Sequence, residues 1–145
     1  MIQVLMTRIL TKVLGTPKDS SRTALHRVAA ANAIWLAQLA QKKKAKDVVI
    51  LNVGKTLFIT NYFVIISGKT QKQNQALAQE MKEQAKMRGL KLFGWEGYQE
   101  GSWILLDFGS VIVHIFMESL RSFYDLEFLW SEAPRVKWQA KSLKD

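Results

Sequence analysis

Two short motifs are the first candidates for chemistry, because each matches part of a nucleotide-handling signature. Ser67-Gly68-Lys69-Thr70 matches the end of a phosphate-binding P-loop, but that loop needs a glycine at the position held by Phe63. Asp107-Phe108-Gly109 spells the metal-binding tripeptide of protein kinases. A kinase also needs a glycine-rich loop, a strand lysine and a catalytic loop, and the sequence has none of these. Neither motif therefore predicts phosphate chemistry.

Gly109-Ser110 raises a third possibility, nucleotidyl transfer. That reaction needs carboxylates close together to hold metal ions and to align the attacking hydroxyl. Here the Gly-Ser pair is followed by Val111-Ile112-Val113-His114, which offers no carboxylate. We therefore predict that the protein is not an enzyme.

The two histidines, His26 and His114, are the remaining candidates for a base or a metal ligand. They lie far apart in the sequence, neither has a second ligand at a suitable spacing, and cysteine is absent. His114 stands within an apolar run, where a single imidazole is more typical of a structural group than of a catalytic base. The sequence predicts no metal site and no cofactor.

The residues around these motifs predict a β-hairpin. Trp103–Leu106 and Val111–Phe116 are β-branched and aromatic runs, and Asp107–Ser110 separates them with a glycine-containing turn. Both runs are apolar throughout rather than alternating, which indicates strands that are covered on both faces. The apolar residues from Leu120 to Trp130 are mostly spaced for one side of a helix.

The rest of the chain predicts two longer helices and three further strands. A helix is expected over residues 21–44, with an apolar stripe through Trp35, and a second over 70–88, stopped by Gly89. The second helix should bury Ala76, Leu77, Met81 and Ala85. Strands are expected at 47–53, 62–67 and near 90–93. This order predicts an α+β fold, an α/β sandwich with one mixed sheet and helices packed on it.

Charge and length divide the chain into a single domain with two basic ends. Residues 1–47 hold nine basic and two acidic side chains, a net charge of +7, while the remaining 98 residues contribute only +2. We expect a basic extension at 1–21, one domain at 22–134 and a loose basic tail at 135–145. A basic extension adds salt-sensitive affinity for polyanions, although a solvated charged surface explains it equally well. No apolar run is long enough to span a membrane.

Several motifs together resemble the ribosomal silencing factor family, also called Iojap-like. They are Glu96-Gly97, Gly101-Ser102-Trp103, the run Leu105–Gly109, Val111–Phe116 and the run Phe123–Trp130. Upstream, Lys46–Val53 and Thr60–Gly68 match the first two strands of the family in order and spacing. The resemblance covers about residues 30–130. It implies a mixed five-stranded sheet with a shape related to nucleotidyltransferase domains.

The resemblance also implies a function by occupancy rather than turnover. Members of this family bind the large ribosomal subunit through its fourteenth protein and sterically block joining with the small subunit, which represses translation. Some also assist late assembly of the large subunit. Such a protein would work in a cytoplasm of bacterial type, in preference to an organelle matrix. A peripheral contact between ribosomal RNA and the basic N-terminal region, and a homodimer of the free protein, stay open.

The family's partner surface maps onto six residues of this chain. Trp103 and Phe108 are expected as apolar anchors, since interfaces concentrate binding energy in aromatic side chains. A phenylalanine at a turn should bury little in its own domain, whereas core packing stays open for Trp103. The resemblance implies that Glu96, Gly97, Asp107 and His114 shape the same surface. On this view Phe108→Glu would keep the fold and lose ribosome binding.

This sequence departs from the family at a few positions. Asn52 and Asn61 stand where the family commonly has Asp, Phe108 replaces a frequent Tyr, and Ser110 replaces a frequent Asp. These changes leave the fold assignment intact and bear on the strength of silencing. Two alternatives from other classes stay open: a nucleotidyltransferase-like enzyme and a general RNA-binding domain, which would bind bare RNA and tolerate Trp103→Ala.

Overall fold

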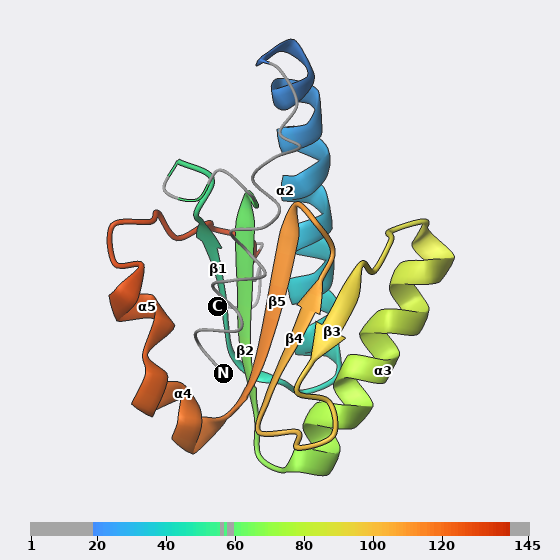
Figure 1. The fold of residues 1–145 in the computed structure, drawn as a ribbon, viewed down its shortest axis with the longest axis vertical. Coiled ribbons are helices and arrows are strands. Elements are labelled where there is room, and N and C mark those ends of the chain that lie inside the picture. The colour runs from blue at the N-terminus through green and yellow to red at the C-terminus, as the bar shows by residue number, and fades with distance from the viewer. Residues whose placement is uncertain (1–18, 56, 58–59, 140–145) are drawn as a thin grey trace, which may run out of the picture.

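One mixed five-stranded sheet organises the protein. The computed structural model describes residues 19–55, 57 and 60–139. The strands stand in the order β1-β2-β5-β4-β3, and only β2 and β5 are parallel to each other. Their bounds are Lys46–Asn52 (β1), Tyr62–Gly68 (β2), Gly94–Glu96 (β3), Trp103–Asp107 (β4) and Val111–Met117 (β5). Figure 1 shows this arrangement. The predicted α+β class with one mixed sheet is confirmed.

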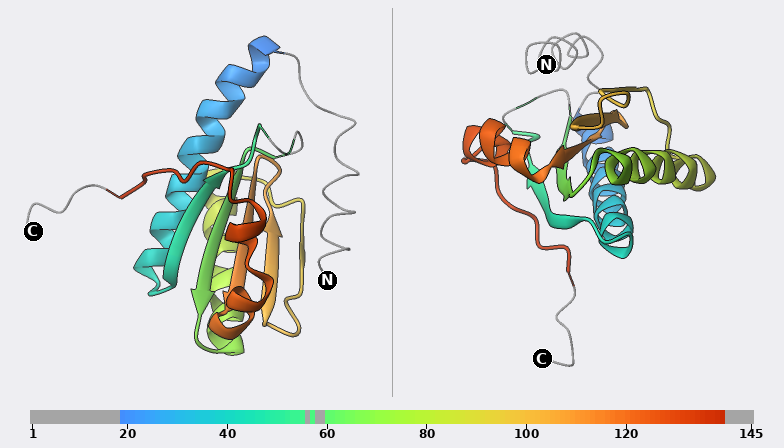
Figure 2. Two further views of the ribbon diagram at one scale, coloured as in Figure 1. Left: turned by 90° about the vertical axis from the view of Figure 1, so that its left-hand side faces the viewer. Right: turned by 90° about the horizontal axis from the view of Figure 1, so that it is seen from below.

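Helices cover the sheet on both sides (Figures 1 and 2). The two long helices, α2 (Asp19–Lys42) and α3 (Gln71–Arg88), pack on one face. The short helices α4 (Glu118–Tyr124) and α5 (Leu126–Leu129) pack on the other. The sheet is therefore the middle of three layers, with an apolar core on either side of it.

The predicted hairpin forms as β4 and β5. Trp103 pairs with Phe116 and Asp107 with Ile112 in an antiparallel ladder. Gly109 sits in the turn at φ 82°, a left-handed conformation that is unfavourable for residues with a Cβ. Every residue of β4, and every residue of β5 except Met117, is buried. The prediction that these strands are covered on both faces is confirmed.

Local signals define both ends of α3. Thr70 caps the first turn, its hydroxyl accepting from the Gln73 amide at 3.0 Å. Gly89 ends the helix at φ 82°, where its amide donates to Ala85 and Lys86. The buried stripe runs through Asn74, Leu77, Ala78, Met81 and Ala85. Ala76 is exposed, so the prediction that it packs in the core is wrong; it lies about 100° around the helix from Leu77.

The third strand begins later than the sequence suggested. Residues 90–93 were expected as a strand, but β3 spans Gly94–Glu96. Leu90 and Leu92 pack against the core between the sheet and α3 instead. The Phe93 amide, one residue before β3, donates to the Asp107 carbonyl of β4 at 2.8 Å. Leu90 and Leu92 therefore belong to the first core, and the chain joins the sheet only after them.

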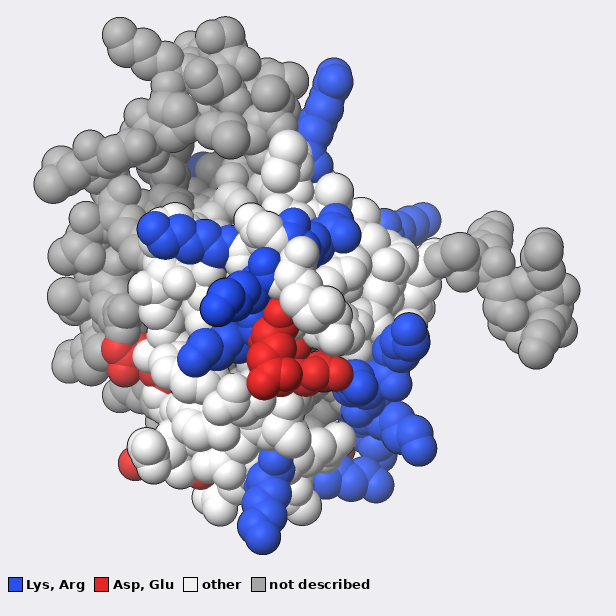
Figure 3. Space-filling model, turned by 90° about the vertical axis from the view of Figure 1, so that its right-hand side faces the viewer, with Lys and Arg blue, Asp and Glu red and all other residues white. Residues whose placement is uncertain are grey.

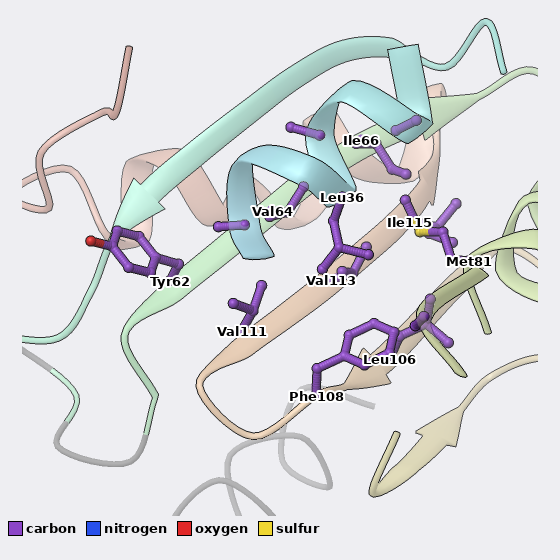
Figure 4. Packing of buried hydrophobic residues seen from close by; sticks show 14 of the residues in the cluster. Leu36, Tyr62, Val64, Ile66, Met81, Leu106, Phe108, Val111, Val113 and Ile115 are labelled. Atoms are coloured by element: carbon purple, nitrogen blue, oxygen red, sulfur yellow. The ribbon is translucent and has the colours of Figure 1, made fainter. Parts of the chain in front are cut away.

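Each face of the sheet has its own core. The first core, between the sheet and the long helices, contains among others Leu36, Val64, Met81, Val113 and Ile115, and Figure 4 shows how these side chains meet. The second core, between the sheet and α4 and α5, includes Phe63, Ile65, Trp103, Phe116 and Leu126. Since successive strand residues point to opposite faces, the apolar runs of β2 and β5 supply both cores at once.

The C-terminal segment seals the outer edge of β1. The Asn52 amide donates to the Pro134 carbonyl at 2.8 Å, and the Val136 amide donates to Ile50 at 2.9 Å. Leu51 and Arg135 form an isolated bridge. The prediction of a loose tail from residue 135 is therefore wrong for its first residues, because their backbone extends the sheet. Residues 1–18 and 140–145, which include most of the predicted N-terminal extension, lie outside the described residues.

A buried arginine ties the last helices to the sheet. Arg121 is 8% exposed and donates to both carboxylate oxygens of Glu127, at 3.0 and 3.1 Å. It also donates to the Ser67 hydroxyl at 2.9 Å and to the Asp47 carbonyl. The single side chain therefore joins α4 and the start of α5 to β1 and β2.

We expect Arg121→Ala to lower the free energy of unfolding by about 3 kcal/mol, because it leaves a partly buried carboxylate and a buried hydroxyl without their donor. Arg135→Ala is the matched control: Arg135 reaches the same Glu127 carboxylate at 3.6 Å but is 65% exposed, so its loss should cost less than about 1 kcal/mol. Urea unfolding of both variants measures the difference. Equal losses would contradict the assigned role of Arg121.

Candidate partner-binding face

Four of the six predicted site residues lie on one face of the sheet. Trp103 and Asp107 alternate with the first-core residues of β4, and His114 stands opposite Leu105 on β5. Glu96 of β3 is the other neighbour of Leu105. Directly opposed residues of paired strands share a face. Glu96, Trp103, Asp107 and His114 therefore all point to the side opposite α2 and α3.

Aromatic rings dominate this side, which we call the aromatic face: Phe63, Trp103, His114 and Phe116, with Tyr124 and Trp130 packed on them. Trp103 stacks on Phe116 with ring centroids 4.7 Å apart and contacts Tyr124 at 4.8 Å. Phe63 meets His114 edge to face at 4.7 Å and Trp130 at 5.9 Å. Such pairs each add about 1 kcal/mol beyond the area that they bury. Tyr124 and Trp130 therefore serve packing of the second core.

Trp103 and His114 form a buried polar pair within these rings. The indole Nε1 of Trp103 donates to Nδ1 of His114 at 3.2 Å. Since Nδ1 accepts, the proton of the neutral ring belongs on Nε2. His114 is fully buried, and burial lowers the pKa of its imidazole to about 3. Nε2 has no hydrogen-bond partner among the described residues. The hydrogen bond fixes the orientation of the His114 ring, and burial keeps that ring neutral.

The two expected anchors are not on the surface. Trp103 is 2% exposed and Phe108 is 3% exposed. The prediction that the Phe108 ring stays uncovered in the turn is wrong, because the ring points into the first core, near Leu106 (Figure 4). Of the two alternatives open for Trp103, the core position is the observed one. Phe108→Glu would bury an unpaired charge, so the expectation that it preserves the fold is withdrawn.

Asp107 shapes the hairpin turn. Its Oδ1 accepts from the Gly109 amide at 2.8 Å, a side-chain contact that stabilises the turn two residues on. The Asp-Phe-Gly sequence is thus a turn motif here. Gly97 follows β3 at φ 78° and begins the loop that leads back to β4. Glu96 and Gly97 are half-buried, so they lie closer to solvent than Trp103, Asp107 or His114.

The sequence reading missed three exposed apolar side chains beside the aromatic face. Phe123 is 77%, Phe128 76% and Leu129 55% exposed. The pattern suggested one helix with one apolar side, but Asp125 takes a left-handed conformation (φ 45°) between α4 and α5. Its side chain then accepts from the Phe128 amide at 3.3 Å and starts α5. This break turns Phe123 and Phe128 outward. Asp125, an aspartate within a run of aromatic residues, was the sequence signal for this break in the helix.

The remaining chemical candidates have structural roles. Thr70 of the P-loop-like segment caps α3, and the Ser67 hydroxyl accepts from Arg121. His26 contacts the Tyr62 hydroxyl at 2.7 Å and the Asn61 amide at 3.2 Å. In the described part of the chain, no group of three or more His, Cys, Asp or Glu side chains is arranged to hold a metal ion.

The described residues contain no helix with the length and apolar character needed to cross a membrane. What they do contain is an α+β domain with an aromatic sheet face, flanked by exposed apolar side chains. An arrangement of this kind is typical of a protein that binds another macromolecule.

Comparison with known proteins identifies the family to which this chain belongs. The sequence profile described as "Ribosomal silencing factor during starvation" matches residues 26–145. The chain is 42% identical over 95 residues to the ribosomal silencing factor of Halalkalibacterium halodurans, which covers 66% of this chain and 81% of that protein. The chain belongs to the ribosomal silencing factor family. The predicted resemblance is confirmed.

Two further comparisons bear on the compartment and on the fold. The chain is 32% identical over 105 residues to the chloroplastic Iojap protein of maize, covering 72% of this chain and 46% of that protein. A crystal structure of a protein from Bacillus halodurans superposes with a TM-score of 0.65 at 37% identity, covering 74% of this chain and 98% of that one. The family thus includes bacterial and chloroplast members.

The buried neutral His114 should make stability depend on pH. In the unfolded chain the pKa of His114 returns to about 6.5, so the unfolded state binds a proton below that pH. In the folded protein the imidazole binds this proton only near pH 3. The contribution is therefore complete above pH 6.5 and is lost as the pH falls. We expect it to remove about 2 kcal/mol of unfolding free energy between pH 7 and pH 5.

His114→Gln provides the control, because the amide oxygen can still accept from Trp103 but does not titrate. Urea unfolding of both proteins over this pH range isolates the contribution of the imidazole. The variant should lose less stability than the wild type on acidification. Parallel losses would show that other groups cause the dependence.

Proposed function

We propose that the protein binds the large ribosomal subunit through that subunit's fourteenth protein and thereby blocks joining with the small subunit. Membership of the silencing factor family supports ribosome-associated repression of translation. The binding partner and the block to subunit joining are the finer part of the proposal. One observation carries it: four of the six expected site residues, Glu96, Trp103, Asp107 and His114, share a single face of the sheet, and exposed apolar side chains flank that face.

The aromatic face has a continuous path to the surface. Trp103 contacts Tyr124 at 4.8 Å, and Tyr124 meets Phe123 edge to face at 5.1 Å. The rings therefore run from the buried indole out to a side chain that is 77% exposed. A rigid ring supported from behind loses little conformational freedom on binding. Phe123 and its neighbour Phe128 are accordingly the side chains proposed as direct anchors.

The charge around these anchors suits a basic partner. Residues 118–132 carry four acidic side chains and one basic one, and the basic one, Arg121, is buried in its pairing with Glu127. Glu118, Asp125 and Glu132 are exposed. This segment is acidic in a chain whose net charge is +9. Complementary charge favours encounter with a basic surface, and proteins that contact ribosomal RNA commonly present one.

The six predicted site residues take a different part in this proposal. Trp103 supports Tyr124 from within the second core, and His114 orients Trp103 through its hydrogen bond. Asp107 and Phe108 shape the hairpin turn and its packing. Glu96 and Gly97, the half-buried pair, are the members proposed to meet the partner directly. The site is then a surface built on buried residues, rather than a set of exposed anchors.

Such a protein acts by occupancy. One bound molecule covers part of the surface through which the two subunits meet, so repression should follow the fraction of large subunits that are occupied. No chemical step is required, in keeping with the run Val111–His114 directly after Gly109-Ser110, which offers no carboxylate. The bacterial relatives favour a bacterial cytoplasm as the site of action. A homodimer of the free protein and a peripheral RNA contact through the basic N-terminal region stay predictions.

Gradient sedimentation of purified subunits tests the proposal. In the presence of the protein, the amount of joined particles should fall and the protein should travel with the large subunit. If it travels with neither subunit and joining is unchanged, the proposed function is wrong. Binding to the isolated fourteenth protein then tests the partner separately.

The double variant Phe123→Ala/Phe128→Ala tests the surface. Both side chains are exposed, so the fold should persist, while loss of two anchors should cost about 2 kcal/mol or more of binding free energy, about 30-fold in affinity for the large subunit. Quantitative co-sedimentation measures this affinity. Val28→Ala is the control, since Val28 is 57% exposed on α2, away from the aromatic face. Equal affinities for the double variant and the wild type would remove α4 and α5 from the interface.

A further inference from the structure

The side of the molecule on which α3 lies is strongly basic. Figure 3 shows this side, where lysine and arginine atoms surround one small acidic group. We call it the basic surface, formed by cations at the end of α2, along α3 and just beyond each helix: Lys42, Lys43, Lys44, Lys46, Lys72, Lys82, Lys86, Arg88 and Lys91. All nine side chains are exposed. We propose that this surface binds the phosphate backbone of ribosomal RNA.

Two contacts hold the helices side by side and make the surface continuous. Lys43 pairs with Glu80 at 2.9 Å, which joins the end of α2 to the middle of α3. Arg88 donates to Asn32 at 3.3 Å, which joins the end of α3 to the middle of α2. The helices therefore run in opposite directions, and the cations that follow α2 lie beside those of α3. Of the two acidic residues of α3, Glu80 is already neutralised.

Helix stabilisation alone does not account for this charge. Cations in the last turn complement the helix dipole, which explains Lys42, Lys86 and Arg88. Lys72, however, lies in the first turn of α3, where a cation is unfavourable and where no acidic residue is present. Lys82 and Lys86 stand four residues apart, a like-charge spacing that costs a few tenths of a kcal/mol. The pattern weakens the helix slightly and so points to an external partner.

Aromatic rings hold three of these cations in place, and one of the three is the Lys91 ammonium, 5.0 Å from the Phe93 ring centroid. The Lys82 ammonium lies 4.6 Å from the Trp95 ring centroid, and Trp95 in turn stacks on Tyr98 at 4.4 Å. The Arg88 guanidinium lies 4.8 Å from the Trp35 ring. All three cationic side chains stay exposed. Ordering long cationic side chains before binding reduces the entropic cost of the contact. A surface of ordered cations fits a fixed array of phosphates.

The basic surface is separate from the acidic segment of α4 and α5. These short helices pack on the opposite face of the sheet from α2 and α3 (Figures 1 and 2). The inference rests on the proposed function for the identity of the RNA, since a protein held on the large subunit lies next to ribosomal RNA. Binding to RNA itself does not depend on contact with the ribosomal protein.

The test measures binding of the full-length protein to protein-free large-subunit RNA over a range of KCl concentrations. The variant Lys72→Gln/Lys86→Gln removes two cations that make no ring or ion-pair contact with the described residues, so its fold should persist. We expect weaker binding and a fall of about 1.5 in the slope of log affinity against log salt, from about 0.7 to 0.9 for each lost phosphate contact. The control Lys55→Gln/Lys137→Gln removes the same charge from exposed positions outside the two helices.

Equal slopes for the two double variants would overturn the proposal, as would wild-type protein that does not bind the RNA. Vesicles of anionic phospholipid form a second arm: if Lys72→Gln/Lys86→Gln weakens binding to vesicles but not to RNA, the surface is a membrane site and the proposal is wrong. Binding of the same variant to the isolated fourteenth protein should be unchanged. Failure of Phe123→Ala/Phe128→Ala to affect that binding would count against the proposed function alone.

Discussion

The burial of β5 on both faces is the constraint on which the rest of the structure depends. Val113 and Ile115 point into the first core, whereas His114 and Phe116 point into the second. A strand of this kind requires a helical layer on each side. The long helices supply one layer, and the broken helix after β5 supplies the other. The path of the chain from α2 to α5 follows from covering this strand and its parallel neighbour β2.

Polar groups inside the second core give it a defined arrangement. Apolar packing alone would tolerate several positions of α4 and α5, since burial has no direction. Arg121 has partners on β1, β2 and α5, and Trp103 has one nitrogen to satisfy at His114. The contacts of Arg121 tie α4 and α5 to β1 and β2 in a defined position. That placement sets where Phe123 and Phe128 reach the surface.

Sequence patterns predicted the strands and long helices well because each rests on a local period. The hairpin, the end of the second helix at Gly89 and the single mixed sheet were predicted from such signals. The errors arose where tertiary packing decided the outcome: Phe108 turned into the first core, Leu90 and Leu92 filled a helical layer, and Val136 joined the sheet. For the site, the resemblance predicted residues of which four share one face of the sheet, but local pattern does not tell which aromatic rings on that face are buried. Contacts between residues far apart in the sequence, such as those of Arg121, produce no periodic pattern in the sequence and so were not predicted.

The backbone contacts of Pro134 and Val136 with β1 bear on how the protein resists aggregation at high concentration. An open strand edge is a template for pairing with other sheets, and long uncovered edges lead to aggregation. Here one edge is closed by the chain's own C-terminal segment, and the opposite edge is the three-residue strand β3, too short to nucleate a stable ladder. The described sheet thus offers no long open edge for pairing with other copies, even though the neighbouring helices carry exposed aromatic side chains.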